Sequence, residues 1–167
     1  MKRQTLALGF VVLSALVACQ SATKASSSPT SQSPEAIEAT LDGSALAGDA
    51  SWQSAIHSDK PLLLVFWQSW CGSCVQEAPM VQRAFQRYGS RLAVAGVVSG
   101  PDDSVDAEHL NKTILRLGLT YPQFRDRDLH LTRLFQVTGT PDVILLDRNR
   151  KVVFRGHELP KSIESFL

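Results

Sequence analysis

The sequence has almost no surplus of charge of either sign. Seventeen basic side chains stand against 16 acidic ones, so the 167-residue chain carries a formal net charge of +1. A chain this close to neutral lacks the strong positive field with which proteins attract nucleic acids or anionic membranes. We therefore expect no nucleic-acid partner.

Cysteine is scarce, and the composition shows no extreme. Hydrophobic residues make up 44% and charged residues 20% of the chain, close to the globular average, which excludes a wholly disordered chain and a polytopic membrane protein. A length of 167 residues suits one domain of ordinary size. Three cysteines are too few for a small disulfide-stapled fold, so the positions of Cys19, Cys71 and Cys74 matter more than their number.

The first 18 residues predict a lipoprotein signal peptide. Lys2 and Arg3 precede an uncharged stretch, 6–18, which as a helix would span roughly 20 Å of a ~30 Å hydrocarbon core. Residues 16–19 read Leu-Val-Ala-Cys and resemble the bacterial lipobox, in which the cysteine receives a lipid and the chain is cut just before it. The resemblance implies lipidation of Cys19. A plain cleaved signal peptide or an uncleaved apolar anchor is the alternative.

A tether follows the lipobox. Residues 20–34 are rich in Ser, Thr and Pro and contain no large apolar side chain, so they cannot bury enough surface to offset their ordering entropy. We expect residues 19–44 to be a lipidated cysteine with a flexible tether, and residues 45–167 to be one folded domain. No Asp follows Cys19, and lipoprotein sorting rules then favour the outer membrane where a cell has two. We expect a periplasm-facing protein of the cell envelope, held by its lipid alone.

Strands and helices alternate along the folded part. The apolar run 61–67 is typical of a strand buried on both faces of a sheet. We expect strands near 61–67, 92–98, 121–124, 143–146 and 151–154, and helices near 51–57, 71–88, 104–117, 128–135 and 160–167. The last two strands flank a turn and form a hairpin. The pattern predicts an α/β fold with a mixed central β-sheet flanked by helices on both faces.

Local signals set several boundaries. Ser51 is a predicted helix N-cap, and Gly89 and Gly118 are predicted helix stops. Residues 125–128, with alternating Arg and Asp, predict a solvated loop whose charges neutralise one another. The four histidines are scattered, and we expect them at the surface.

Cys71 and Cys74 enclose Gly72 and Ser73 directly after the first buried strand. At a helix N-terminus, free N–H groups and the helix dipole lower the pKa of a cysteine, and the resulting thiolate attacks disulfides. Two intervening residues let the second cysteine reach back and close a disulfide. The spacing predicts that Cys71 attacks and Cys74 resolves. Half of a zinc site and an inert disulfide are the alternatives, although zinc would need further ligands at suitable spacing.

Glu77 follows Cys74 by three residues. On a helical wheel Cys74, Ala78 and Val81 face the core, and Glu77 lies on the margin of that stripe. A half-buried carboxylate is costly unless it is protonated or paired, so we expect a raised pKa and proton exchange with the Cys74 thiol. A solvated surface glutamate is the alternative.

These features together resemble the thioredoxin superfamily. Trp70 precedes the cysteine pair, Pro79 follows it by five residues, and Thr140-Pro141 stands before the closing hairpin. In that family the matching proline, here Pro141, is cis and packs beside the cysteines. The residue before it, here Thr140, offers backbone hydrogen bonds to an extended substrate. The resemblance thus places Trp70, Thr140 and Pro141 at the substrate-binding surface and implies the thioredoxin fold.

The pattern Cys-Xaa-Xaa-Cys-Xaa-Xaa-Glu-Xaa-Pro is similar to that of the TlpA/ResA branch, the membrane-tethered extracytoplasmic thioredoxins. This resemblance implies a thiol–disulfide oxidoreductase acting on protein thiols and disulfides. It needs no cofactor, because the redox-active pair Cys71–Cys74 carries the electrons. The branch includes reductases for cytochrome c maturation and for envelope redox or stress homeostasis, normally supplied with electrons by a DsbD/CcdA-type membrane partner. Two departures are Val65, where thioredoxin has a buried aspartate, and Ser73, where many relatives have proline.

Other functions on related folds stay open at this point. A peroxiredoxin- or glutathione-peroxidase-like enzyme would reduce peroxide through one cysteine of low pKa. An SCO-like copper-binding protein would have a wider cysteine spacing and a dedicated histidine downstream. A thioredoxin-like module could also bind without catalysis, but the intact cysteine pair favours the oxidoreductase.

Overall fold

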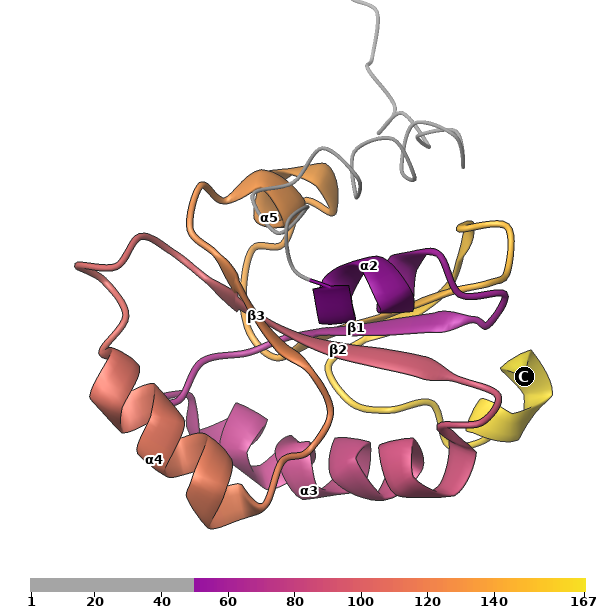
Figure 1. Ribbon diagram of the computed structural model, residues 1–167, viewed down its shortest axis with the longest axis horizontal. Coiled ribbons are helices and arrows are strands. Elements are labelled where there is room, and N and C mark those ends of the chain that lie inside the picture. The colour runs from indigo at the N-terminus through magenta and orange to yellow at the C-terminus, as the bar shows by residue number, and fades with distance from the viewer. Residues whose placement is uncertain (1–49) are drawn as a thin grey trace, which may run out of the picture. The chain divides into compact units, whose positions relative to one another are not determined.

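The computed structural model describes residues 50–167 (Figure 1). The predicted signal peptide, the lipobox Cys19 and the tether over 19–44 lie outside the described residues and stay predictions. None of the helices within 50–167 has the length and apolarity that a membrane crossing requires.

Five strands form one mixed sheet in the order β3-β2-β1-β4-β5. The strands are β1 (Leu62–Phe66), β2 (Ala93–Ser99), β3 (Gln123–Asp126), β4 (Asp142–Leu146) and β5 (Val152–Gly156). β1, β2 and β3 pair in parallel, whereas β4 is antiparallel to β1 and β5 to β4. The predicted mixed α/β sheet, with a closing hairpin, is confirmed.

Helices cover both faces of this sheet (Figure 1). The helices are α2 (Ala50–Ile56), α3 (Gly72–Tyr88), α4 (Ala107–Leu117), α5 (His130–Leu134) and the 3-10 helix η1 (Ile163–Phe166). α3 and α4 lie on one face, and α2 and α5 lie on the other. The final helix, which was predicted over 160–167, is in the structure only the short 3-10 helix η1.

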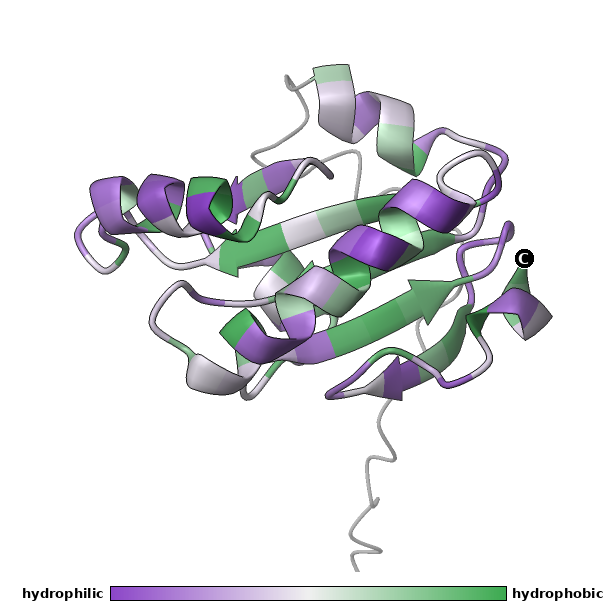
Figure 2. Cartoon of the chain, turned by 90° about the horizontal axis from the view of Figure 1, so that it is seen from below, coloured by the Kyte–Doolittle hydropathy of each residue, from purple (hydrophilic) through white to green (hydrophobic). Residues whose placement is uncertain are grey.

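Alternation along β1 explains its continuous apolar run. Leu63 and Val65 point into the core on the α3 side, while Leu64 and Phe66 pack on the other face with Trp52 of α2. Successive side chains of a strand face opposite sides, so a strand covered on both faces must be apolar throughout. Figure 2 shows the same division, with hydrophobic strands inside and hydrophilic outer faces on the helices.

Two predicted helix starts need correction, and one predicted helix stop is confirmed. α2 begins at Ala50, so Ser51 lies inside the helix and is not its N-cap. α4 begins at Ala107, because the side chain of Asp106 caps it by accepting a hydrogen bond from the N–H of His109 at 2.9 Å. Gly118 ends α4 in the left-handed conformation, with φ 61°, as a C-terminal glycine should.

Gly89 ends α3 for a different reason. Its φ of −58° is ordinary for any residue, so no left-handed turn is needed. A Cβ atom at this position would lie 2.7 Å from the carbonyl oxygen of Phe85. Glycine is required here for space.

The predicted solvated loop at 125–128 is wrong for its first half. Arg125 and Asp126 belong to β3, and Asp126 is only 2% exposed. Its carboxylate accepts hydrogen bonds from the N–H groups of Leu131 at 3.1 Å and Thr132 at 2.8 Å, and from the Thr132 hydroxyl at 2.6 Å. Asp126 thus fastens the start of α5 to the end of β3.

Candidate active site

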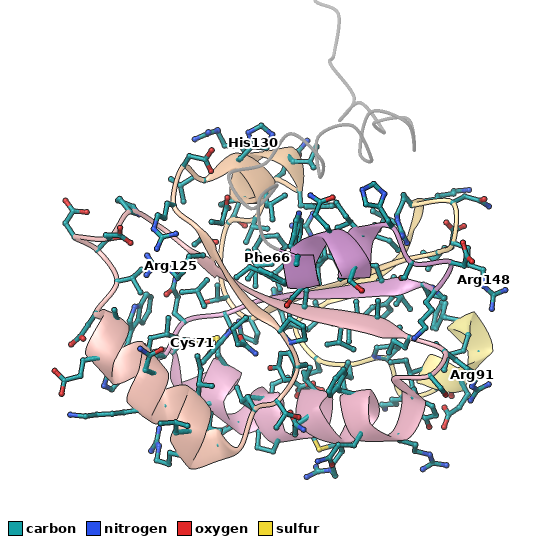
Figure 3. The ribbon with its side chains drawn as sticks, in the orientation of Figure 1. Phe66, Cys71, Arg91, Arg125, His130 and Arg148 are labelled. Carbon is teal, nitrogen blue, oxygen red and sulfur yellow. A yellow bond between two sulfur atoms is a disulfide. The ribbon has the colours of Figure 1, made fainter. Side chains whose placement is uncertain are left out.

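The cysteine pair lies at the N-terminus of α3, after the carboxyl end of β1. Cys71 and Cys74 form a disulfide, with their Cα atoms 5.2 Å apart (Figure 3). Cys71 is the N-cap of α3, and its sulfur accepts a hydrogen bond from the N–H of Cys74 at 3.3 Å. This position exposes the Cys71 sulfur to the free N–H groups of the first helical turn. The same groups would stabilise a thiolate in the reduced protein.

The surroundings of the two sulfurs differ. Cys71 is 8% exposed and Cys74 is 2% exposed, and Trp70 beside them is 72% exposed. The hydroxyl of Ser73 lies 3.5 Å from the Cys71 sulfur. A partner protein can therefore reach Cys71 more readily than Cys74, which matches the predicted order of attack and resolution.

A segment far along the chain completes this site. The Thr140–Pro141 peptide bond is cis, and the Cys71 sulfur lies 3.4 Å from the carbonyl oxygen of Thr140. Pro141 is buried at the start of β4, which pairs with β1 and so returns this segment to the cysteines. The cis-proline beside the cysteine pair, which the resemblance implied, is present.

A cleft of about 480 Å³ opens beside Cys71. Trp70 and Thr140 line it together with the polar side chains of Gln68, Ser99 and Thr132. These three residues were not among the predicted site residues. The signal in the sequence is that Gln68 ends the apolar run 61–67, two residues after β1.

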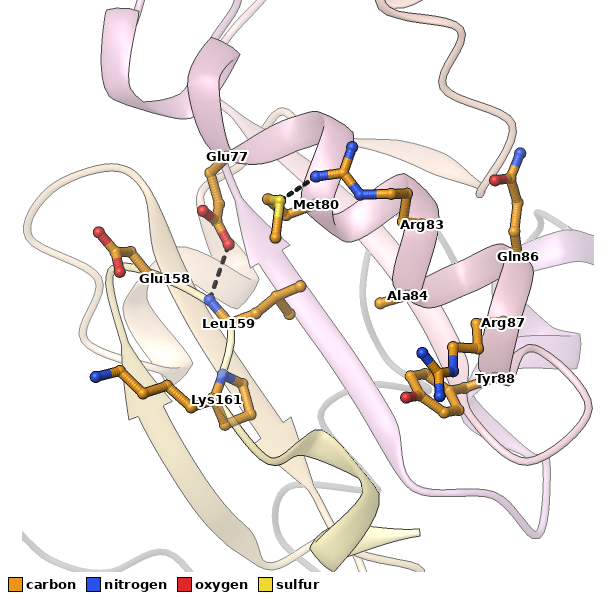
Figure 4. A pocket seen from close by; sticks show the side chains of 11 residues that line it. Glu77, Met80, Arg83, Ala84, Gln86, Arg87, Tyr88, Glu158, Leu159 and Lys161 are labelled. Carbon is orange, nitrogen blue, oxygen red and sulfur yellow. Dashed lines mark hydrogen bonds between the residues drawn. The ribbon is translucent and has the colours of Figure 1, made fainter.

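A larger groove of about 700 Å³ lies elsewhere along α3, between Met80, Tyr88 and Leu159 (Figure 4). Neither cysteine lines it. We therefore assign the disulfide chemistry to the smaller cleft.

Glu77 lies one turn after Cys74 and is half-buried. Its carboxylate accepts a hydrogen bond from the N–H of Leu159 at 2.8 Å (Figure 4). Burial raises the pKa of Glu77, and the negative charge of Glu158 raises it further, while the bond from Leu159 opposes both. The predicted half-burial and raised pKa are confirmed. Leu159 as the partner was not predicted, because it lies 82 positions away in the sequence.

Tyr121 belongs to the same environment. Burial raises the pKa of its hydroxyl to about 12, and the charge of Glu77 contributes in the same direction. The phenol is therefore protonated at neutral pH. The burial of both groups shows that Glu77 lies in a poorly solvated region, one turn from the resolving cysteine.

The structure brings Trp70, Cys71, Cys74, Thr140 and Pro141 together and holds Glu77 one turn further along α3. Cys19 is outside the described residues. Within 50–167, no group of three or more His, Cys, Asp or Glu side chains is placed to hold a metal ion.

Three comparisons relate this geometry to known proteins. The profile of the Redoxin family matches residues 30–165. A thioredoxin of Alicyclobacillus acidocaldarius is 40% identical over 47 residues, which cover 28% of this chain and 45% of that protein. The thiol-disulfide oxidoreductase ResA of Geobacillus thermodenitrificans is 28% identical over 96 residues, 58% of this chain and 53% of that protein. The chain thus spans about half the length of these curated relatives.

A solved structure supports the fold. The crystal structure of StoA from Bacillus subtilis superposes with a TM-score of 0.56 at 19% identity, over 65% of this chain and 81% of that one. At this identity the likeness concerns the fold alone. The family profile covers most of the chain, from before the described residues into η1. The chain belongs to the Redoxin family, and its fold is that of the thioredoxin-like proteins.

Proposed function

We propose that this protein is a thiol–disulfide oxidoreductase of the ResA type that reduces disulfides in other proteins. One observation carries the proposal. The Cys71–Cys74 pair lies at the start of α3, and its more exposed residue, Cys71, lines a cleft beside the cis Thr140–Pro141 segment. The ResA relative, which is named for the same activity, supports it.

The proposed reaction moves two electrons without a cofactor. The Cys71 thiolate attacks one sulfur of a substrate disulfide, forms a mixed disulfide and expels the other substrate sulfur as a thiolate. Cys74, deprotonated, then attacks the Cys71 sulfur. This step closes the Cys71–Cys74 disulfide and releases the second substrate thiolate, which takes a proton. The protein ends oxidised and the substrate reduced.

Other residues have defined parts in this proposal. Trp70 and Thr140 border the cleft and hold an extended substrate segment, with Pro141 fixing the backbone beside Cys71. Glu77 accepts the proton of the Cys74 thiol when that thiol is activated. The raised pKa of Glu77 supports this role, because it brings the proton affinity of the carboxyl closer to that of a thiol.

The cellular setting is also part of the proposal. The lipobox supports a lipid on Cys19 that holds the domain at the envelope, facing the periplasm. A DsbD/CcdA-type membrane protein would return electrons to the Cys71–Cys74 disulfide. The substrates would then be apocytochrome c or other envelope proteins whose thiols must stay reduced.

Insulin reduction with dithiothreitol tests the chemistry. The wild-type chain should accelerate the reaction, and Cys71→Ala should abolish the acceleration. Cys74→Ala should accumulate mixed disulfides on Cys71 when it is expressed in the native envelope. Faster consumption of hydrogen peroxide than of insulin disulfides would instead indicate a peroxidase, and activity that survives Cys71→Ala would move the chemistry away from Cys71.

A further inference from the structure

The cleft beside Cys71 has a buried polar floor. Gln68 is 8% exposed, and its side-chain Nε2 donates a hydrogen bond to the backbone carbonyl of Ser99 at 2.7 Å. A carbonyl oxygen can only accept, so this bond fixes which end of the amide is nitrogen. The amide oxygen Oε1 is therefore the end that is left for another partner.

No donor within residues 50–167 lies in hydrogen-bonding distance of Gln68 Oε1, although the atom is buried. A buried acceptor without a donor costs free energy, because it has given up its hydrogen bonds to water. A ligand that brings an N–H or O–H group to this oxygen would recover that cost.

The neighbouring hydroxyls direct their protons away from the cleft. The Thr132 oxygen lies 2.6 Å from a carboxylate oxygen of Asp126 and 2.7 Å from the Ser99 hydroxyl. The carboxylate can only accept, so the single proton of Thr132 goes to Asp126 and the Ser99 hydroxyl donates to Thr132. The Ser99 and Thr132 hydroxyls thus have no proton left for a ligand, and Gln68 Oε1 is the buried atom of this floor that lacks a partner within the described residues.

This floor is within reach of a substrate held at Cys71. The carbonyl of Gln68 accepts a hydrogen bond from the N–H of Cys71 at 3.1 Å. The two residues therefore belong to the same tight turn. Gly72 and Gly139 line the same cleft, and a Cβ atom at either would meet nothing within 4 Å. The cleft therefore has free space at both glycines.

We propose that this acceptor-lined floor is a specificity subsite for the residue next to the attacked cysteine of the substrate. It takes a side chain that carries a hydrogen-bond donor, such as an amide, hydroxyl, imidazole or ammonium group, and it disfavours a carboxylate. The inference rests on the proposed thiol–disulfide exchange and names the substrate class for it.

Peptide mixed disulfides that differ only in one side chain of similar size test the subsite. Each peptide carries one cysteine joined to 5-thio-2-nitrobenzoate, with Asn, Leu or Asp beside the cysteine, in two series for the two flanking positions. In the reduced full-length chain, Cys71 attacks the sulfur of the peptide cysteine and releases the coloured thiolate. Cys74 then attacks the Cys71 sulfur and frees the peptide. Rates are normalised to those with dithiothreitol, which removes differences in intrinsic reactivity. The blank is Cys71→Ser, which accounts for any reaction at Cys19.

In one series the normalised rate for the Asn peptide should exceed that for the Asp peptide by roughly tenfold or more. The Asp carboxylate has no proton to donate to the acceptor oxygen of Gln68, whereas the Asn amide has. In Gln68→Met, which keeps the shape and removes the amide oxygen, the Asn-to-Leu ratio should fall about three- to tenfold. The comparison is the Asn-to-Leu ratio within each variant, so a general loss of activity through damage to the fold cancels and only lost recognition changes the ratio. Gln86→Met, the same change on the exposed face of α3, is the matched control and should keep the wild-type ratio.

Normalised rates that are equal for Asn, Leu and Asp in the wild-type chain would overturn the subsite, and would mean that Gln68 is satisfied by buried water only. This comparison needs no variant, so it decides even if Gln68→Met does not fold. If no peptide reacts faster with the wild-type chain than with Cys71→Ser, the proposed function itself fails.

Discussion

Ser73 places a side-chain hydroxyl beside the attacking sulfur. It lies 3.5 Å from Cys71 Sγ, and a disulfide sulfur carries no hydrogen, so the hydroxyl is the donor. In the reduced protein the same hydroxyl can donate to the Cys71 thiolate, which lowers the pKa of the thiol. Ser73 thus gives the attacking sulfur a polar contact from within the cysteine pair.

We expect Ser73→Ala to raise the pKa of Cys71 and to slow its alkylation by iodoacetamide about three- to tenfold at pH values below that pKa. The pH dependence of the alkylation rate measures this. Ser73→Thr, which keeps the hydroxyl, should preserve the wild-type profile. Identical profiles for Ser73→Ala and wild type would show that the helix N-terminus alone sets the thiolate.

Glu77 couples stability to pH in a defined direction. Its folded-state pKa is raised above the ordinary 4.5, so the folded protein disfavours the ionised carboxylate. The stability that the neutral form contributes is complete below pH 4.5 and is lost as the pH rises through the raised value. In Glu77→Gln the unfolding free energy of the oxidised protein should stay flatter over this range and equal or exceed the wild-type value at neutral pH. Gln can still accept the bond from Leu159, and denaturant titrations at several pH values measure the difference.

The same variant tests the proton transfer. Glu77→Gln should change the pH–rate profile of mixed-disulfide resolution by Cys74, because the carboxylate that takes the thiol proton is gone. Glu158→Gln is the comparison: it removes an exposed charge that raises the pKa of Glu77 but keeps the Glu77 carboxylate, so it should shift the profile to lower pH without removing the proton acceptor. Superimposable profiles for wild type and Glu77→Gln would mean that Glu77 serves only to bind the backbone N–H of Leu159, and that the thiol proton goes directly to water.

At the scale of elements, α5 depends on one buried carboxylate. Asp126 ends β3 and accepts three hydrogen bonds from residues at the start of α5. Removal of an ionised acceptor leaves buried N–H groups without partners. We expect Asp126→Ala to lower the unfolding free energy by about 3 kcal/mol, measured by thermal and denaturant unfolding.

Asp126→Asn should cost less, because one oxygen can still accept. Asp103→Ala removes an exposed carboxylate and should change stability by less than about 0.5 kcal/mol. Because Thr132 lines the cleft, the loss of Asp126 should also reduce disulfide exchange at temperatures where the fold survives. Unchanged stability of Asp126→Ala would show that α5 is held by its apolar contacts alone.

Most elements could be predicted from the sequence because their signals are local. Apolar runs marked the buried strands, and the helical wheel placed Cys74, Ala78 and Val81 in the core as observed. The misses came from partners that local patterns cannot show. The charges at 125–128 resembled a solvated loop, yet the partners of Asp126 lie five and six residues ahead, beyond a turn.

At the scale of the whole molecule, the site assembles where distant segments meet. The cysteine pair and helix start could be derived from spacing alone, and the resemblance supplied Thr140 and Pro141, which β4 returns to Cys71 across 69 positions. Gln68 was missed, because a single glutamine after a strand has no distinctive pattern. Its meaning depends on the Ser99 carbonyl 31 positions away, which only the β1–β2 pairing brings near.

The position of the domain in the cell should depend on Cys19, whereas the disulfide-exchange activity of the domain should not. One acyl chain gives only marginal membrane binding, whereas two or more hold a protein firmly. We expect Cys19→Ser to abolish labelling by radioactive palmitate and to move the protein out of the membrane fraction. If the variant still fractionates with membranes and the wild type takes up no label, the uncleaved segment 6–18 is the anchor. Purified Cys19→Ser should reduce insulin as fast as the wild type, because every residue of the proposed reaction lies within 50–167.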